Sequence, residues 1–107
     1  VVNWFIRQVI DGETIKVFGD GKIIRDFLYV DDCIEALLTC ALCDAAYGQI
    51  FNVASGVPMD FIELADALVK AAGGGHWEFA PFSPERAMQE PGNFYADITK
   101  IKQIAGW

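Results

Sequence analysis

The stretch from Gly19 to Asp32 constrains the fold most, because a turn, a strand and a helix start follow one another there without a linker. Asp20-Gly21 favours a tight turn, since glycine accepts the positive φ angle that such turns need. The aromatic and β-branched run 27–30 predicts a largely buried strand. Asp31 and Asp32 precede an apolar series with helical spacing, where a carboxylate can cap free backbone N–H groups.

Arg25 is the unusual residue of this stretch. An arginine that enters an apolar strand must keep its charge paired or reach a solvent-filled cleft. Its guanidinium presents a planar fork of donors that suits a phosphate or a carboxylate ligand. The alternative is an internal ion pair with Asp26, Asp31 or Asp32, which lie close in sequence. Spacing alone leaves these two roles equally open.

Hydrophobic periodicity and turn residues divide the remaining chain into short elements. The predicted helices cover residues 1–11, 34–43, 60–72 and 97–105, the third capped by Asp60 and the last by Asp97. The predicted strands cover residues 15–18, 24–30, 49–54 and 77–79, and residues 81–93, which contain three prolines, are predicted as a loop. This order predicts a single α/β domain over residues 1–107, with a few short strands and three or four helices.

The amino-acid composition limits which classes of partner the chain can bind. The net charge of −7 argues against nucleic acid, because binding its backbone needs clustered Lys and Arg. It does not exclude a small phosphate ligand, which one or two arginines can bind. The hydrophobic fraction of 53% is high for so small a chain and predicts an exposed apolar face that another surface covers. No apolar run is long enough to span a membrane, and no signal peptide is visible.

The cysteines favour a reducing compartment over a redox or metal role. Their number is odd, three in all, which predicts reduced thiols and a cytoplasmic location. Cys40 and Cys43 form a C-x-x-C in the last turn of a predicted helix, where the helix dipole disfavours the thiolate. Only Cys33 and His76 could complete a zinc site, so no metal is expected.

Five motifs in order carry a resemblance to a known family. They are residues 17–21 (VFGDG), 25–32 (RDFLYVDD), 49–56 (QIFNVASG), 96–100 (ADITK) and 106–107 (GW). Together they resemble the C-terminal third of the extended short-chain dehydrogenases/reductases, the NAD-dependent nucleotide-sugar epimerases and dehydratases of the UDP-glucose 4-epimerase type. The resemblance implies a small mixed α/β substrate-binding lobe, with the NAD-binding N-terminal Rossmann domain absent from these residues.

The resemblance also implies a binding role for particular residues. Arg25 is expected to bind the diphosphate of a UDP- or dTDP-linked sugar, with Arg86 as the second arginine. The strand residues expected beside the base are Lys16, Val17 and Phe18, with Phe27 nearby. Many family members have the second arginine directly before Pro-Gly-Asp or Gly-Asp, whereas this chain has Glu90 before Pro91-Gly92-Asn93. Asn93 therefore takes the place of an acid that often contacts a sugar hydroxyl.

Catalytic features of the family are missing from this stretch of chain. It contains no G-x-G-x-x-G turn for a dinucleotide and no tyrosine with a lysine four residues later. We therefore expect no catalytic residue and no bound cofactor here, with NAD implied for the full-length enzyme. The leading hypothesis is an NDP-sugar-binding lobe that is inactive alone. The alternative is a stand-alone binding or self-assembly module, possible as a homo-oligomer, that uses its apolar face for protein association.

Overall fold

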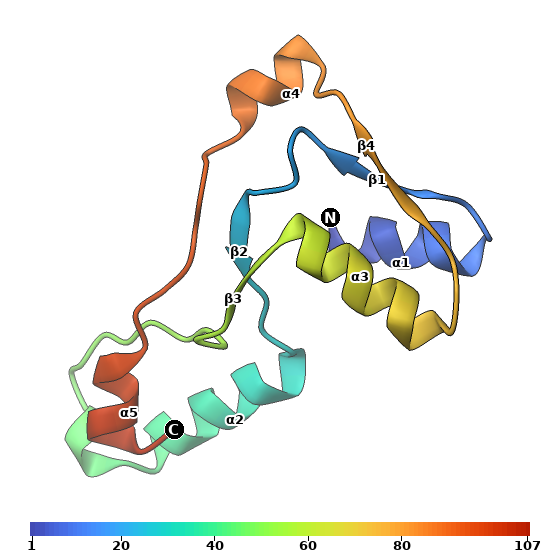
Figure 1. Cartoon of the computed structure of the whole chain (residues 1–107). Coiled ribbons are helices and arrows are strands. Elements are labelled where there is room, and N and C mark those ends of the chain that lie inside the picture. Colours follow the sequence, from blue (N-terminus) through green and yellow to red (C-terminus); the bar gives the residue numbers. More distant parts are fainter. The chain divides into compact units, whose positions relative to one another are not determined.

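The computed structural model describes the whole chain, residues 1–107, as five α-helices joined by short strands (Figure 1). The helices are α1 (Val2–Ile10), α2 (Val30–Ala41), α3 (Phe61–Ala72), α4 (Pro84–Gln89) and α5 (Thr99–Ala105), with a 3-10 helix η1 (Asp44–Ala46). The strands are β1 (Ile15–Phe18), β2 (Ile24–Asp26), β3 (Pro58–Asp60) and β4 (Trp77–Ala80). None of the helices has the length and apolarity that crossing a membrane requires.

The chain divides into two compact units. Unit 1 comprises Val1–Arg25 and Met59–Asn93, and unit 2 comprises Asp26–Pro58 and Phe94–Trp107. The unit boundaries fall within β2 and β3, which form a two-stranded sheet. The single domain expected over residues 1–107 stays a prediction.

Unit 1 is built on β1 and β4, which pair in parallel with Ile15 opposite Trp77 and Phe18 opposite Ala80. A parallel pair needs a long crossover, and α3 lies within it. Helices α1 and α3 pack against each other and against β1 (Figure 1). The buried apolar side chains of this unit are Phe5, Ile15, Val17, Phe61, Leu64 and Ala65.

Helix α3 has the clearest end signals in the chain. The Asp60 side chain accepts from the Glu63 backbone N–H at 2.8 Å, and the Glu63 carboxylate accepts from the Asp60 N–H at 2.9 Å. This reciprocal capping box satisfies two otherwise free donors. The helix ends at Gly73, whose φ of 74° is the left-handed conformation that favours glycine. The predicted Asp60 cap is confirmed.

Unit 2 is held together by a small apolar cluster. Its buried members are Ala36, Ala54, Ile98 and Ile101, and Phe51, Val53 and Trp107 pack against them. Asp26 fixes the turn that leads into this cluster, because its carboxylate accepts hydrogen bonds from the Ser55 N–H at 2.8 Å, the Ser55 hydroxyl and the Gly56 N–H at 3.3 Å. Gly56 is required there, since its φ is 71° and a Cβ would lie 2.6 Å from Ile98 Cδ1.

Several sequence predictions about these elements are wrong in detail. Residues 49–54 form no strand. Phe51, Val53 and Ala54 belong to or pack against the unit 2 cluster, whereas Ile50 is exposed. The apolar run of residues 49–54 therefore reflects burial in this cluster and not pairing in a sheet. The strand predicted through Val30 ends at Asp26, and α2 already begins at Val30. Strand β3 was not predicted.

The predicted helix starts and the late loop also differ from the structure. The N-cap of α2 is Tyr29, so Asp31 and Asp32 do not cap it but lie in its first turn, where the dipole still favours a carboxylate. The predicted loop 81–93 contains α4, which brings the helices to five. Ser83 caps this helix by accepting from the Arg86 N–H at 3.3 Å, and Pro84 occupies its first turn.

Candidate functional site

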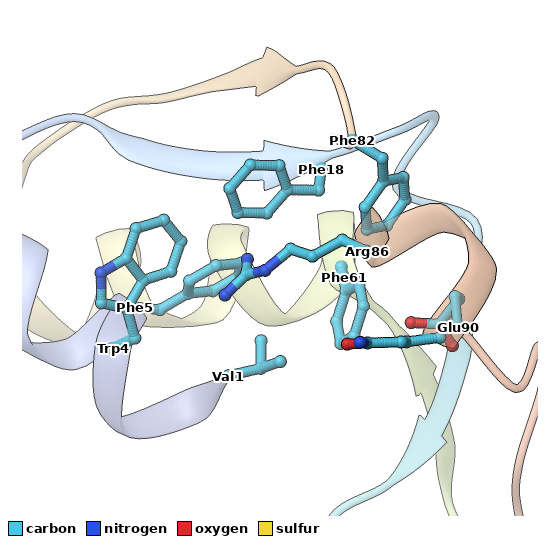
Figure 2. Close-up of a pocket in the computed structure, with 9 residues that line it drawn as sticks. Val1, Trp4, Phe5, Phe18, Phe61, Phe82, Arg86 and Glu90 are labelled. Carbon is cyan, nitrogen blue, oxygen red and sulfur yellow. The ribbon is translucent and has the colours of Figure 1, made fainter. Parts of the chain in front are cut away.

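Unit 1 contains a pocket of about 260 Å³ with mostly aromatic walls (Figure 2). It is lined by Val1, Trp4, Phe5, Phe18, Phe61, Phe82, Arg86, Gln89 and Glu90. These residues come from α1, the end of β1, the start of α3 and the segment from Phe82 to Glu90. The volume lies just below the range of about 300–1,000 Å³ typical of sites for drug-sized ligands. The pocket is therefore large enough for part of such a ligand, such as a flat ring.

Phe18 is the centre of the aromatic wall. Its ring stacks on Trp4 at 5.6 Å between centroids and on Phe82 at 5.7 Å. These offset stacks are favourable arrangements for aromatic rings, so the wall is formed before any ligand arrives. Gly19 permits the approach of Phe82, because a Cβ at residue 19 would lie 2.7 Å from Phe82 Cε2.

Arg86 provides a positive charge at this pocket. Figure 2 shows its side chain extending from α4 toward Phe18, and its guanidinium carbon lies 5.1 Å from the Phe18 ring centroid. That distance is within the range of a cation–π interaction. Arg86 is exposed and forms no ion pair with a carboxylate. Its donors are therefore available to an anion.

Arg25 lies behind the pocket wall and is already paired. Its Nη1 donates to the carbonyl oxygens of Ile24 at 2.8 Å and Gly92 at 2.6 Å, and its Nη2 donates to the Glu90 carboxylate. The guanidinium carbon also lies 5.7 Å from the centroid of Phe61, a pocket residue. An ion pair therefore exists, as one of the two sequence hypotheses proposed, but its partner is 65 residues away.

The three aspartates near Arg25 in sequence are not its partners. Asp26 instead accepts from Ser55 and Gly56 within unit 2. Burial by itself raises the pKa of Asp26, but the hydrogen bonds from these residues outweigh burial and hold the pKa below 3.8. The pairing predicted with Asp26, Asp31 or Asp32 is therefore wrong, because a charge paired by tertiary contact carries no signal in local spacing.

The other residues predicted to bind the ligand lie in different parts of the structure. Lys16 forms an ion pair with Glu78, its cross-strand neighbour on β4. Val17 is fully buried in the unit 1 core and does not line the pocket. Phe27 belongs to unit 2 and does not line the pocket. The Asn93 side-chain oxygen accepts from the Ile24 N–H at 3.0 Å. Of the predicted set, the structure brings Phe18 and Arg86 together at the pocket.

Sequence reasoning missed most of the pocket wall. Phe5 and Phe61 lie on helix faces whose spacing predicts core packing, which hides a second role in a cavity wall. Trp4 lies on α1 but outside its predicted apolar face. Phe82 follows Pro81 in the predicted loop and carried no periodic signal. In the sequence Glu90 stands out only as a departure from the family motif. Its contact with Arg25 can be recognised only in the folded structure.

Comparison with known proteins places the chain in a family. The sequence pattern of the NAD dependent epimerase/dehydratase family matches residues 1–54, about half of the chain. The chain belongs to this family. It is similar to a UDP-glucose 4-epimerase of Mycolicibacterium smegmatis, with 34% identity over 100% of this chain and 33% of the relative. It is also similar to the low-salt glycan biosynthesis protein Agl12 of Haloferax volcanii, with 33% identity over 96% of this chain and 32% of the relative.

Solved structures give the same family and fold. A Thermotoga maritima UDP-glucose 4-epimerase with UDP-glucose is 27% identical, with a TM-score of 0.77 over 99% of this chain and 33% of that one. A Bacillus cereus UDP-glucuronic acid 4-epimerase, in complex with UDP-glucuronic acid and NAD, is 25% identical with a TM-score of 0.80 over the same shares. The family and the small mixed α/β fold predicted from the motifs are confirmed. The chain spans about a third of the length of these relatives.

The residues described here do not fit the NAD that the family uses. Phosphates of a dinucleotide bind where a glycine-rich turn leads from a strand into a helix. Here the Gly19-Asp20-Gly21 turn after β1 leads toward β2 instead, and α3 follows β3 without an intervening glycine. No step of hydride chemistry is therefore assigned to these residues.

Proposed function

We propose that these 107 residues form the nucleotide-sugar-binding part of an NAD-dependent epimerase or dehydratase. The observation that carries this proposal is an aromatic pocket with an unpaired arginine at its wall, in a chain whose family includes structures with UDP-sugars. Flat aromatic surfaces suit a nucleobase, and a guanidinium suits a diphosphate. The corresponding ligands are UDP- or dTDP-linked sugars.

In this proposal, different residues bind the base and the phosphates of the ligand. The base would lie against the aromatic wall around Phe18, at the end of β1. Arg86 would donate charge-assisted hydrogen bonds to the phosphates. Arg25 would be the second phosphate ligand, and the phosphate would reach it by displacing the Glu90 carboxylate.

We further propose that these residues are catalytically inactive by themselves. They contain no tyrosine followed four residues later by lysine, and no turn suited to a dinucleotide. Their contribution to a full-length enzyme would be to hold the diphosphate while the sugar reacts. Whether that enzyme is an epimerase or a dehydratase is set by residues that contact the sugar ring.

A calorimetric titration with UDP and uridine tests the binding role. Wild type is expected to bind both, and UDP at about 100 times its Kd stabilises the fold by about 2.7 kcal/mol. Arg86→Gln should weaken UDP binding about tenfold or more and leave uridine within about threefold, since uridine has no phosphate. The matched control is Arg7→Gln, an exposed arginine on α1 outside the pocket. Failure of wild type to bind either ligand at millimolar concentration would overturn the proposal.

The alternative function is a self-association module, and one observation favours it. An apolar face of α2 is exposed, with Ile34, Leu37 and Leu38 each at least 48% accessible, and Leu42, directly after the helix, is exposed as well. Such a contiguous apolar surface is typical of a contact site. Light scattering over a range of protein concentrations would show a rising mass if this reading holds. A monomer at every concentration that still binds UDP would contradict it.

A further inference from the structure

We propose that Glu90 is a built-in competitor for the ligand phosphate at Arg25, and so sets how much affinity a diphosphate adds at this pocket. The inference rests on the proposed function, because it concerns the same ligand. It assigns to Glu90 a role in selecting the charge of that ligand.

Most donors of the Arg25 guanidinium are already occupied within the protein. A guanidinium has five N–H groups. Two hydrogen bonds from Nη1 go to the carbonyls of Ile24 and Gly92, and Nη2 donates to Glu90. The carbonyl bonds hold the guanidinium in place beside Phe61, and the Glu90 carboxylate takes up a donor that an anion would otherwise use. A phosphate cannot use the Arg25 fork fully while Glu90 is there.

Glu90 lies where it can compete with a ligand phosphate. It lines the pocket, directly after α4, and Figure 2 shows it on the same side as Arg86. Its carboxylate also accepts from the Gly92 N–H at 3.3 Å, so it sits in a local anion site made of one cation and one backbone donor. A ligand phosphate next to it would place two like charges at one guanidinium, which is unfavourable.

Glu90 competes with the ligand phosphate for Arg25 from within the same molecule, and this competition is reversible. Because Glu90 is tethered beside Arg25, its effective concentration there exceeds that of a dissolved ligand. Its side chain is 22% exposed, so a displaced carboxylate can be hydrated at the pocket rim. The diphosphate therefore binds Arg25 only after it has displaced Glu90. The free energy that this displacement costs reduces the affinity that the contact with Arg25 adds.

Calorimetry on Glu90→Gln tests this role. Glutamine keeps the shape and can still accept from Gly92, but it removes the negative charge. UDP binding should tighten about tenfold or more, which corresponds to about 1.4 kcal/mol, while uridine binding stays within about twofold. The matched control is Glu85→Gln, which removes the same charge from an exposed α4 residue that does not line the pocket. It should change UDP affinity by less than about threefold.

A double variant, Arg25→Gln with Glu90→Gln, removes both charges and keeps a neutral hydrogen-bonding pair. Because the wild-type pair is already self-neutralised, its UDP affinity should stay within about threefold of wild type. A loss of about tenfold would mean that Arg25 contributes its full binding energy to the phosphate in the wild type, with no cost for displacing Glu90, and would overturn the inference. This variant also tests the role of Glu90 if Glu90→Gln alone fails to fold, as judged by circular dichroism.

The outcomes separate the inference from the function it rests on. Wild type that binds UDP, with Glu90→Gln and Glu85→Gln indistinguishable, refutes the role of Glu90 and leaves the proposed function intact. Absence of UDP and uridine binding in every variant at millimolar ligand refutes the proposed function, and the inference with it.

Discussion

The Asp26 carboxylate is the polar group on which the turn of unit 2 depends most. It accepts from the Ser55 N–H, the Ser55 hydroxyl and the Gly56 N–H. Asp26→Ala removes all three acceptor contacts. Gly56 in this turn has a φ of 71°, and a Cβ there would lie 2.6 Å from Ile98 Cδ1, so the turn lies close to the unit 2 cluster.

The expected cost follows from these bonds. A hydrogen bond to a charged group contributes about 1.5–3 kcal/mol where it is buried. Asp26 is only half-buried, so water replaces part of each lost bond. We expect Asp26→Ala to lower the free energy of unfolding by about 2–3 kcal/mol, and Asp26→Asn, which keeps one acceptor oxygen, by about 1 kcal/mol.

Urea unfolding at neutral pH, followed by circular dichroism, measures these changes. The matched control is Asp32→Asn, an exposed aspartate in the first turn of α2, for which we expect a loss of about 0.5 kcal/mol or less. An Asp26→Ala variant no less stable than this control would refute the assignment of the turn to Asp26.

The dependence on pH gives a second check of the same reasoning. The folded pKa of Asp26 lies below 3.8, so the ionised carboxylate stabilises the fold at pH values above 3.8. That stability is lost as the pH falls through the lower folded pKa. The stability difference between wild type and Asp26→Asn should therefore be constant from about pH 7 to about pH 5 and should shrink below 3.8. A difference that grew on acidification would contradict the sign of the shift.

Three further substitutions test the packing by urea unfolding. Asp60→Ala removes the α3 cap and should cost about 0.5–2 kcal/mol, whereas Asp60→Asn keeps an acceptor and should cost less; equal losses would contradict the capping role. Gly21→Ala should cost more than about 1 kcal/mol, because φ is +71° and the new Cβ would lie 2.6 Å from Ile62 Cγ1, and an unchanged midpoint would show that the turn relaxes. Ile101→Ala should cost about 2–5 kcal/mol, well above Ile101→Val, since Ile101 is fully buried.

The features that could be predicted from sequence are those encoded by neighbours along the chain. The α3 cap depends on Asp60 and a residue three positions later, so a local motif contains the whole interaction. Strand β1 follows from a short β-branched run and matches the predicted range 15–18. Helix α4 was missed although Ser83-Pro84 is a recognised helix start, because three prolines in residues 81–93 favoured a loop.

The pocket and its charges depend on contacts that are distant in sequence. Glu90 and Arg25 are separated by 65 residues, and nothing in the spacing of either predicts the other. Phe18 is flanked by Trp4 and Phe82, which come from opposite ends of unit 1 in the sequence. Family resemblance supplied the expectation that Arg25 and Arg86 matter, but only tertiary structure shows that Arg25 is paired and Arg86 is not.

Arg25 and Asp26 are adjacent in sequence, yet each side chain belongs to a different unit. Arg25 is bound by Glu90 and Gly92 within unit 1, whereas Asp26 is bound by Ser55 and Gly56 within unit 2. Successive side chains of a strand point to opposite faces, so neighbouring residues can have different partners. Removing the Asp26 charge should therefore lower stability, whereas removing the Arg25 and Glu90 charges together should leave UDP affinity close to that of wild type.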